Sequence, residues 1–265
     1  MKSIVVVGGG YGATRYVESL LWNADYKLYI GGTGYCGKSQ KLSKLFGLKY
    51  IPFEELKGLT SIDCIILAIP PSIRRHYVNL LINMFSYQGI VISEKPLFIN
   101  ESEAGFYDGI TDRFATVCQR DFFKNEYLID KQQSIYNVSF PSFFSNEMDN
   151  IVHVMPHVLS WFASQNQAIS EIWKDGNNHF CGKCGHKAIS IFFHKRNNSK
   201  EQVQINDVAY ANVNYRLCND KIVQDIFAFD ASDFRLNISR AIEVSYQISN
   251  LLMQSKKNEK EYFFT

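Results

Sequence analysis

The stretch SIVVVGGGYGAT, residues 3–14, decides the fold, because a short β-branched run leads through three glycines into a segment with helical spacing. Gly8, Gly10 and Ala13 give the pattern Gly-x-Gly-x-x-Ala at this junction. The first glycine permits a tight turn, the second admits a pyrophosphate, and the small third residue lets the helix pack on the strand. Glycines that only make a turn are the alternative, but the strand–turn–helix context favours nucleotide binding. The residues predicted to bind the cofactor here are Gly8, Gly10, Tyr11, Gly12 and Ala13.

The first half of the chain repeats this alternation of strand and helix. Its strand-like runs are almost continuously hydrophobic, which is typical of a parallel sheet covered on both faces. Right-handed crossovers then predict an α/β fold, a doubly wound parallel (Rossmann) sheet. We expect strands at 3–9, 27–32, 63–71, 89–96 and 114–119, and helices at 11–23, 38–48, 72–85 and 101–110.

The pattern changes after residue 120 and predicts a second, α+β domain built on an antiparallel sheet. We expect an apolar helix at 150–164, strands at 186–196, 202–217 and 223–229, and a long final helix at 237–255. The chain therefore divides into a dinucleotide-binding domain, residues 1–120, and a domain for substrate binding and oligomerisation, residues 121–265. The alternating apolar positions of 202–217 are compatible with a homodimer.

Composition excludes several classes of function. The 265 residues carry 28 basic and 26 acidic side chains, a net charge of +2, which is no electrostatic footprint for nucleic acid or an anionic membrane. No apolar run is long enough to span a bilayer, and no signal peptide is evident. The six cysteines are scattered, so we expect reduced thiols and a cytoplasmic location. The partner that we expect is a small-molecule substrate.

The second strand leads into YIGGTGYCGKSQK, residues 29–41, which contains no acid. A carboxylate at this place normally holds the ribose hydroxyls of NAD. Thr33 and Lys38 stand here instead, and a hydroxyl with a nearby cation suits a 2′-phosphate. The sequence thus favours NADP as cofactor, with NAD as the alternative, while Lys38 as a plain solvated helix residue stays open.

Two further stretches carry a family resemblance: AIPPSIRRHYVNLL, residues 68–81, and GIVISEKPL, residues 89–97. With the glycine turn before them, they resemble the glucose–fructose oxidoreductase / inositol dehydrogenase (Gfo/Idh/MocA) family over roughly residues 3–120. The resemblance implies an NAD(P)-dependent oxidoreductase acting on a sugar, cyclitol or nucleotide-linked sugar. It also implies that Ile69, Pro70, Pro71 and Glu94 line the cofactor site.

Lys95 is the residue to which this resemblance gives a catalytic role. In relatives the corresponding lysine is the acid/base that contacts cofactor and substrate, and a cis bond often precedes the next proline. The local chemistry agrees, because a lysine in a partly dry site can donate a proton to a substrate oxygen. The alternative is an ordinary strand-end lysine that faces solvent.

The resemblance extends thinly beyond residue 120. Gln119 lies where it implies substrate contact, although an ordinary crossover between domains is as good an explanation. In VHVMPHVLSWF, residues 152–162, His157 matches a family histidine and His153 replaces the family aspartate. Both are candidate catalytic and substrate-binding residues, in a helix expected to begin near Pro156. The missing aspartate leaves open whether alcohol oxidation is retained.

The motif HFCGKCGH, residues 179–186, places His179, Cys181, Cys184 and His186 within eight residues. Zinc knuckles draw their ligands from two distant segments, so we predict a glycine-rich loop and no metal here. A metal or redox role for Cys181 and Cys184 remains the alternative. Two other functions also stay open: an imine reductase and a non-catalytic regulator that binds NAD(P) or sugar.

Overall fold

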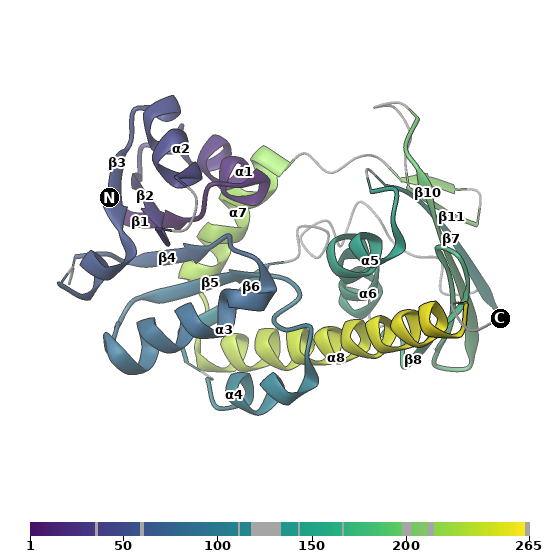
Figure 1. Ribbon diagram of the computed structural model, residues 1–265. Coiled ribbons are helices and arrows are strands. Elements are labelled where there is room, and N and C mark those ends of the chain that lie inside the picture. The colour runs from purple at the N-terminus through teal and green to yellow at the C-terminus, as the bar shows by residue number, and fades with distance from the viewer. Residues whose placement is uncertain are drawn as a thin grey trace. The chain divides into compact units, whose positions relative to one another are not determined.

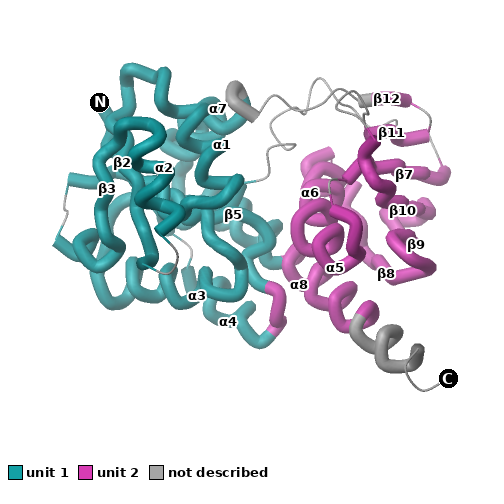
Figure 2. Tube along the Cα trace, turned by 45° about the horizontal axis from the view of Figure 1, so that its top comes forward, with its two compact units in different colours: residues 1–98, 102–119, 214–242 teal, residues 99–101, 120–213, 243–265 magenta. Residues whose placement is uncertain are grey.

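The structure, a computed structural model, forms two compact units (Figure 1). It describes residues 1–34, 37–58, 61–110, 112–117, 134–142, 144–165, 167–197, 203–206, 208–210 and 215–262. Unit 1 comprises residues 1–98, 102–119 and 214–242, and unit 2 comprises residues 99–101, 120–213 and 243–265 (Figure 2). The units do not follow a single cut at residue 120, because residues 214–242 group with the first sheet. The roles given to the two domains stay predictions.

Unit 1 is built on a six-stranded parallel sheet, which confirms the doubly wound α/β fold. Its order is β3-β2-β1-β4-β5-β6, with the reversal of strand order between β1 and β4. Every neighbouring pair is parallel. The strands are β1 (Lys2–Val7), β2 (Tyr26–Gly32), β3 (Lys49–Pro52), β4 (Cys64–Leu67), β5 (Ile90–Glu94) and β6 (Phe114–Val117). The sequence does not reveal β3, because its four residues are too few for a periodic pattern.

Helices cover this sheet, and most lie where the sequence predicts them. They are α1 (Tyr11–Leu20), α2 (Lys38–Phe46), α3 (Pro71–Asn79) and α4 (Ala104–Asp108), with a π-helical turn at Leu80–Met84 and 3₁₀ turns at Phe53–Gly58 and Glu101–Glu103. α1 buries Ala13, Tyr16, Val17 and Leu20, because these residues share one helical face.

The strand predicted at 223–229 is wrong, because α7 (Tyr215–Phe227) occupies most of that segment and packs against α1 (Figure 1). Cys218, Ile222 and Ile226 are all buried, and their spacing of four residues is helical. A window of seven residues was too short to distinguish this spacing from the alternation of a strand.

Unit 2 contains a six-stranded sheet of order β12-β11-β7-β10-β9-β8. Its strands are β7 (Ile135–Ser142), β8 (Glu171–Gly176), β9 (His179–Cys184), β10 (Lys187–Lys195), β11 (Val203–Ile205) and β12 (Val208–Tyr210). β7 and β10 are parallel and the other neighbours are antiparallel, so the sheet is mixed rather than wholly antiparallel. Where the structure describes residues 202–217, the predicted single strand is instead the short hairpin β11–β12 and the beginning of α7.

The helix predicted at 150–164 is confirmed, but the expectation that it begins near Pro156 is wrong. It runs through α5 (Glu147–Asp149), a π-helical turn at Asn150–Val154 and α6 (Met155–Ser164). Proline has no N–H to donate and its ring crowds the carbonyl four residues earlier. The π-helical turn just before Pro156 widens the helix there, which relieves that conflict without ending the helix.

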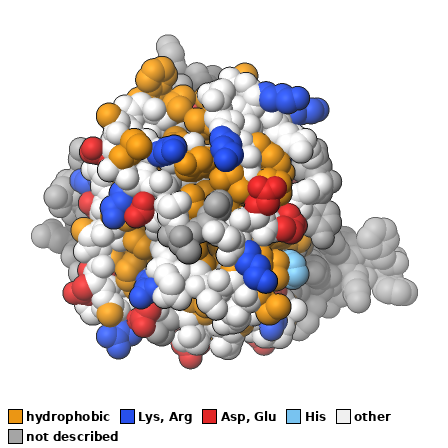
Figure 3. All heavy atoms as spheres, turned by 90° about the vertical axis from the view of Figure 1, so that its left-hand side faces the viewer, with side chains coloured by type: hydrophobic (Ala, Val, Ile, Leu, Met, Phe, Trp, Pro, Cys, Tyr) orange, Lys and Arg blue, Asp and Glu red, His pale blue; other side chains and the backbone are white. Residues whose placement is uncertain are grey.

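α8 (Ala231–Tyr262) contributes side chains to the cores of both units. Ile238 belongs to the core of unit 1, whereas Val244, Ile248 and Leu251 belong to the core of unit 2. None of the helices in the described part of the chain is both long and apolar enough to cross a membrane. On the face drawn in Figure 3, basic, acidic and apolar side chains are interspersed.

Candidate functional site

The carboxyl ends of four neighbouring strands bring the predicted cofactor residues to one edge of the first sheet. Val7 pairs with both Gly31 and Leu67, and Leu67 pairs with Ser93, so β1, β2, β4 and β5 end at the same level. Open α/β sheets bind ligands at this edge, next to the reversal of strand order. The candidate cofactor residues lie at these four strand ends or in the turns and helix starts that follow them: Gly8, Gly10, Tyr11, Gly12, Ala13, Thr33, Lys38, Ile69, Pro70, Pro71, Glu94 and Lys95.

Each of the three consecutive glycines, Gly8, Gly9 and Gly10, is surrounded differently, so a side chain would meet different atoms at each position. Gly8 has a φ of +134°, and a Cβ there would lie 2.4 Å from the Ala68 carbonyl oxygen. A Cβ on Gly9 would lie 2.3 Å from the Ser39 amide nitrogen, at the beginning of α2. A Cβ on Gly10 would meet no described atom within 4 Å. Gly8 and Gly9 thus serve internal packing, while Gly10 borders open space.

That open space lies beside the N-terminus of α1. Gly10 is the N-cap residue and supplies no side-chain hydrogen bond. The Thr14 N–H donates to the Gly10 carbonyl oxygen at 3.1 Å, so the N–H groups of residues 11–13 precede the first intrahelical bond. Unsatisfied N–H groups and the positive end of the helix dipole suit a phosphate. These residues fit a dinucleotide.

Thr33 and Lys38 lie beside the same turn. The half-buried Thr33 follows β2, and its carbonyl oxygen accepts a hydrogen bond from the Tyr77 hydroxyl at 3.4 Å. Lys38 is the exposed first residue of α2. The close approach of Gly9 to the α2 backbone places Lys38 next to the glycine turn.

The segment between β4 and α3 is held by a buried arginine that the sequence did not suggest. Arg74 is 1% exposed; its Nη2 donates to the Ile69 carbonyl oxygen at 2.7 Å, and its Nη1 donates to the Pro96 carbonyl oxygen. Burial lowers the pKa of Arg74, which the nearby Tyr107 and Glu94 partly oppose. Arg74 therefore joins the segment that follows β4 to the segment that carries Lys95. The one sequence signal was its position one helical turn after Pro71.

Lys95 is not a solvent-facing lysine. Its side chain is 11% exposed, and its Nζ lies 3.2 Å from Glu94 Oε2. The peptide bond between Lys95 and Pro96 is cis. The fully buried Tyr16 lies near the Glu94 carboxylate. Burial, and after it the Glu94 charge, raise the pKa of the Tyr16 hydroxyl. The catalytic role of Lys95 stays a prediction.

The two candidate histidines lie in unit 2 and in unlike surroundings. His153 is exposed in the π-helical turn, where its ring stacks on Phe144 with centroids 5.1 Å apart. His157 is half-buried in α6. Their roles stay predictions, and Gln119 lies outside the described residues.

The loop predicted at 179–186 is wrong, because most of it is strand β9. Cys181 and Cys184 are three residues apart, so their side chains leave opposite faces of that strand. Cys184 is 3% exposed, and its thiol donates to the Gln167 carbonyl oxygen at 2.9 Å. The two thiols therefore form neither a joint metal site nor a redox pair.

Solved structures with the same fold include oxidoreductases. A myo-inositol dehydrogenase from Corynebacterium glutamicum superposes with a TM-score of 0.69 at 12% identity, covering 97% of both chains. A Gfo/Idh/MocA family oxidoreductase from Vibrio cholerae gives 0.71 at 11% identity, covering 98% of this chain and 100% of the other. A myo-inositol dehydrogenase from Lactobacillus casei, in complex with NAD(H) and myo-inositol, gives 0.66 at 9% identity, covering 97% and 95%. No protein-family model and no curated protein sequence matches this chain.

Proposed function

We propose that this chain, which has the fold of the Gfo/Idh/MocA oxidoreductases, is an NAD(P)-dependent oxidoreductase of a sugar, cyclitol or nucleotide-linked sugar. One observation carries the proposal: the uncapped N-terminus of α1 and the largely buried Lys95 lie at the same edge of the first sheet. The substrate class follows the dehydrogenases that share the fold.

The residues of the glycine turn would hold the pyrophosphate through the N–H groups at the beginning of α1. Thr33 and Lys38 would face the adenosine ribose, and the absence of a carboxylate between residues 29 and 41 favours NADP. Ile69, Pro70 and Pro71 would flank the rest of the dinucleotide. The bound coenzyme supplies a hydride donor or acceptor at the nicotinamide ring.

Lys95 would move the proton that accompanies the hydride. In the reducing direction its ammonium donates a proton to the carbonyl oxygen while the carbonyl carbon receives the hydride, so an alcohol forms. In the oxidising direction its neutral amine takes the hydroxyl proton as the hydride leaves. Glu94, at 3.2 Å, orients the lysine side chain.

Lys95→Ala tests this assignment against Lys57→Ala, an exposed lysine of the same unit. We expect Lys95→Ala to lower the rate of hydride transfer about 10²–10⁴-fold, followed as nicotinamide absorbance, while dinucleotide affinity is kept. The substrate panel contains sugars, cyclitols and nucleotide sugars with NADP⁺ and NAD⁺. Equal rates for both variants would contradict the role of Lys95.

The same panel includes imines, since an imine reductase is the alternative enzyme. A wild-type protein that binds dinucleotide and turns over no member of the panel would be a regulator. His157→Ala, measured in parallel, tests whether that histidine takes part in turnover.

A homodimer is a separate proposal, supported by exposed aromatic side chains on the second sheet. Trp173 is 38% exposed and Phe192 is 47% exposed. Light scattering of the wild-type protein and of Phe192→Asp measures the mass in solution. We expect a dimer for the former and a monomer for the latter.

A further inference from the structure

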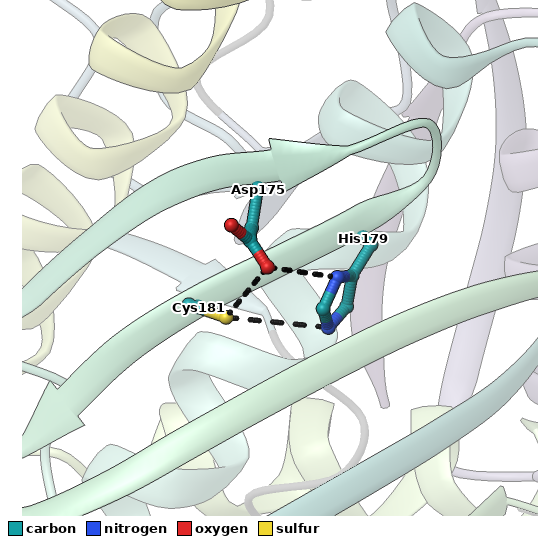
Figure 4. Close-up of side chains that lie close together, drawn as sticks. All are labelled: Asp175, His179 and Cys181. Carbon is teal, nitrogen blue, oxygen red and sulfur yellow. Dashed lines mark hydrogen bonds and ion pairs between the residues drawn. The ribbon is translucent and has the colours of Figure 1, made fainter.

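The solvent-facing side of a hairpin in unit 2 carries three side chains of different chemistry. In the hairpin of β8 and β9, Trp173 pairs with Cys181 and Gly176 pairs with His179, so Asp175 is the extra residue on β8. Asp175 lies two residues after Trp173, and Cys181 lies two residues after His179, so the alternation of side chains along each strand places Asp175, His179 and Cys181 on one face of the sheet (Figure 4).

Two of the distances within this group match those between zinc ligands, while Cys181 Sγ lies 4.0 Å from His179 Nε2. Asp175 Oδ2 lies 3.2 Å from His179 Nδ1 and 3.5 Å from Cys181 Sγ. Tetrahedral zinc, with bonds of about 2.0–2.3 Å, holds such ligand atoms roughly 3.3–3.6 Å apart. One ligand atom from each residue lies within 4.8 Å of the other two.

The fourth participant is Ser190 of β10. Its Oγ lies 2.8 Å from His179 Nε2, and Ser190 pairs with Cys181 across the strands. Metal-binding histidines commonly use one ring nitrogen for the metal and donate from the other to such a partner. Ser190 therefore leaves Nδ1, the nitrogen beside Asp175, for a metal ion.

Solvent and charge are also suitable for a cation. The side chain of Asp175 is 53% exposed and that of His179 is 33% exposed, so an ion can enter from solution in a single chain. Trp173 and Phe192 pair with Cys181 and His179, so a dimer formed through these two aromatic residues would cover the same face. A thiolate and a carboxylate would balance a divalent charge, and nitrogen, sulfur and oxygen together suit zinc better than magnesium or calcium. Binding releases the Cys181 thiol proton to solvent.

We propose that Asp175, His179 and Cys181 bind one Zn²⁺ ion, with a water molecule as the fourth ligand. The site goes beyond the proposed oxidoreductase function and does not depend on it. It differs from the four-residue motif of the sequence, because Cys184 lies on the opposite face and His186 is an exposed residue beyond β9.

Titration with Co²⁺ tests the site directly, since a cobalt–thiolate bond gives a charge-transfer absorption band. We expect the band at one equivalent in the wild-type protein and its loss when Zn²⁺ is added. No band, or a band unchanged in Cys181→Ser, would overturn the proposal.

Variants assign the ligands through Zn²⁺ affinity measured by calorimetry. Asp175→Asn, His179→Gln and Cys181→Ser are each expected to weaken binding on the order of 100-fold or more, and Ser190→Ala about tenfold. His186→Gln and Glu171→Gln are the matched controls and should bind as the wild type does. Circular dichroism confirms that each variant is folded, and equal losses in controls and ligand variants would refute the assignment.

Discussion

At the scale of single residues, substitutions of Gly9 and Gly10 test two different properties, internal packing at Gly9 and dinucleotide binding at Gly10. Gly9→Ala places a methyl group 2.3 Å from the backbone nitrogen of Ser39, so we expect a loss of about 1–3 kcal/mol in the free energy of unfolding. Gly10→Ala meets open space at an ordinary φ of −91°, and its stability should change by less than about 0.5 kcal/mol. Urea unfolding measures both.

Gly10→Ala should nevertheless weaken NADP⁺ or NAD⁺ binding about tenfold, because the methyl group occupies the space expected for the pyrophosphate. Isothermal titration gives the dissociation constants. Unchanged affinity in this folded variant would place the dinucleotide elsewhere.

Arg74 offers a second prediction at this scale. Arg74→Met keeps the length of the side chain but leaves the carbonyl oxygens of Ile69 and Pro96 without its hydrogen bonds. We expect the free energy of unfolding to fall by roughly 3 kcal/mol, measured with urea. Arg75→Met is the control, because that guanidinium is exposed and lies over the Phe106 ring at 5.3 Å, and the change should cost about 1 kcal/mol or less.

Whether a site residue could be predicted from the sequence depends on how far along the chain its partners lie. The glycine turn could be identified because its residues are contiguous and its chemistry is local. Arg74 could not, because its partner Pro96 lies on another segment, after β5. The group of Asp175, His179 and Cys181 was missed for a related reason: it depends on how β8 pairs with β9, and the register between two strands cannot be deduced from either strand alone.

At the scale of elements, Glu147 ties four segments of unit 2 together. Its carboxylate accepts hydrogen bonds from Lys174 of β8 at 2.7 Å, from the Asn178 N–H at 2.9 Å and from Ser255 of α8 at 2.8 Å. Burial alone would raise the pKa of Glu147, but these hydrogen bonds outweigh burial and lower it. The carboxylate is therefore the form that stabilises the fold.

The sign of the pH dependence follows. A lowered pKa contributes stability that is present above the ordinary value of 4.5 and is lost as pH falls through the lowered value. We expect Glu147→Gln to cost roughly 1–3 kcal/mol at pH 7 and to flatten the decline of stability below pH 4.5. Thermal unfolding from pH 3 to pH 7 measures this.

The control is Glu171→Gln, which removes an ion pair with Lys183 whose side chains are both more than half exposed. Such a pair contributes about 0–1 kcal/mol. An equal cost for the two variants would show that Glu147 does not organise its segments.

The elements themselves were predicted unevenly. Hydrophobic runs such as the buried β4 could be assigned, since every residue of that strand is buried. The alternation read into residues 223–229 was wrong because a buried helical face of two turns can imitate a strand. A helix at 150–164 was predicted, but its continuation through Pro156 was not, since a π-helical turn has no sequence pattern of its own.

At the scale of the whole molecule, α8 gives each unit part of its core. Ile238 is 3% exposed in unit 1, and Ile248 is fully buried in unit 2. Either residue changed to Ala should lower the free energy of unfolding by about 2–5 kcal/mol. Only Ile238→Ala should also weaken dinucleotide binding, because its core supports the candidate cofactor site.

Calorimetric unfolding with and without NADP⁺ measures both the loss of stability in each variant and the stabilisation that the dinucleotide still provides. Ile248→Ala should keep the stabilisation that the dinucleotide provides. The same loss of that stabilisation in both variants would contradict a cofactor site confined to the first sheet.

The division of unit 1 along the chain has a consequence for synthesis. α7, whose Asp220 accepts a hydrogen bond from Asn23 at 2.9 Å, is translated only after residues 120–213. At about 5–20 residues per second, the ribosome needs roughly 5–20 s for that interval. During this time the nascent first sheet has no α7 to pack against α1. A chain stalled before residue 214 would expose that apolar surface and be prone to aggregate.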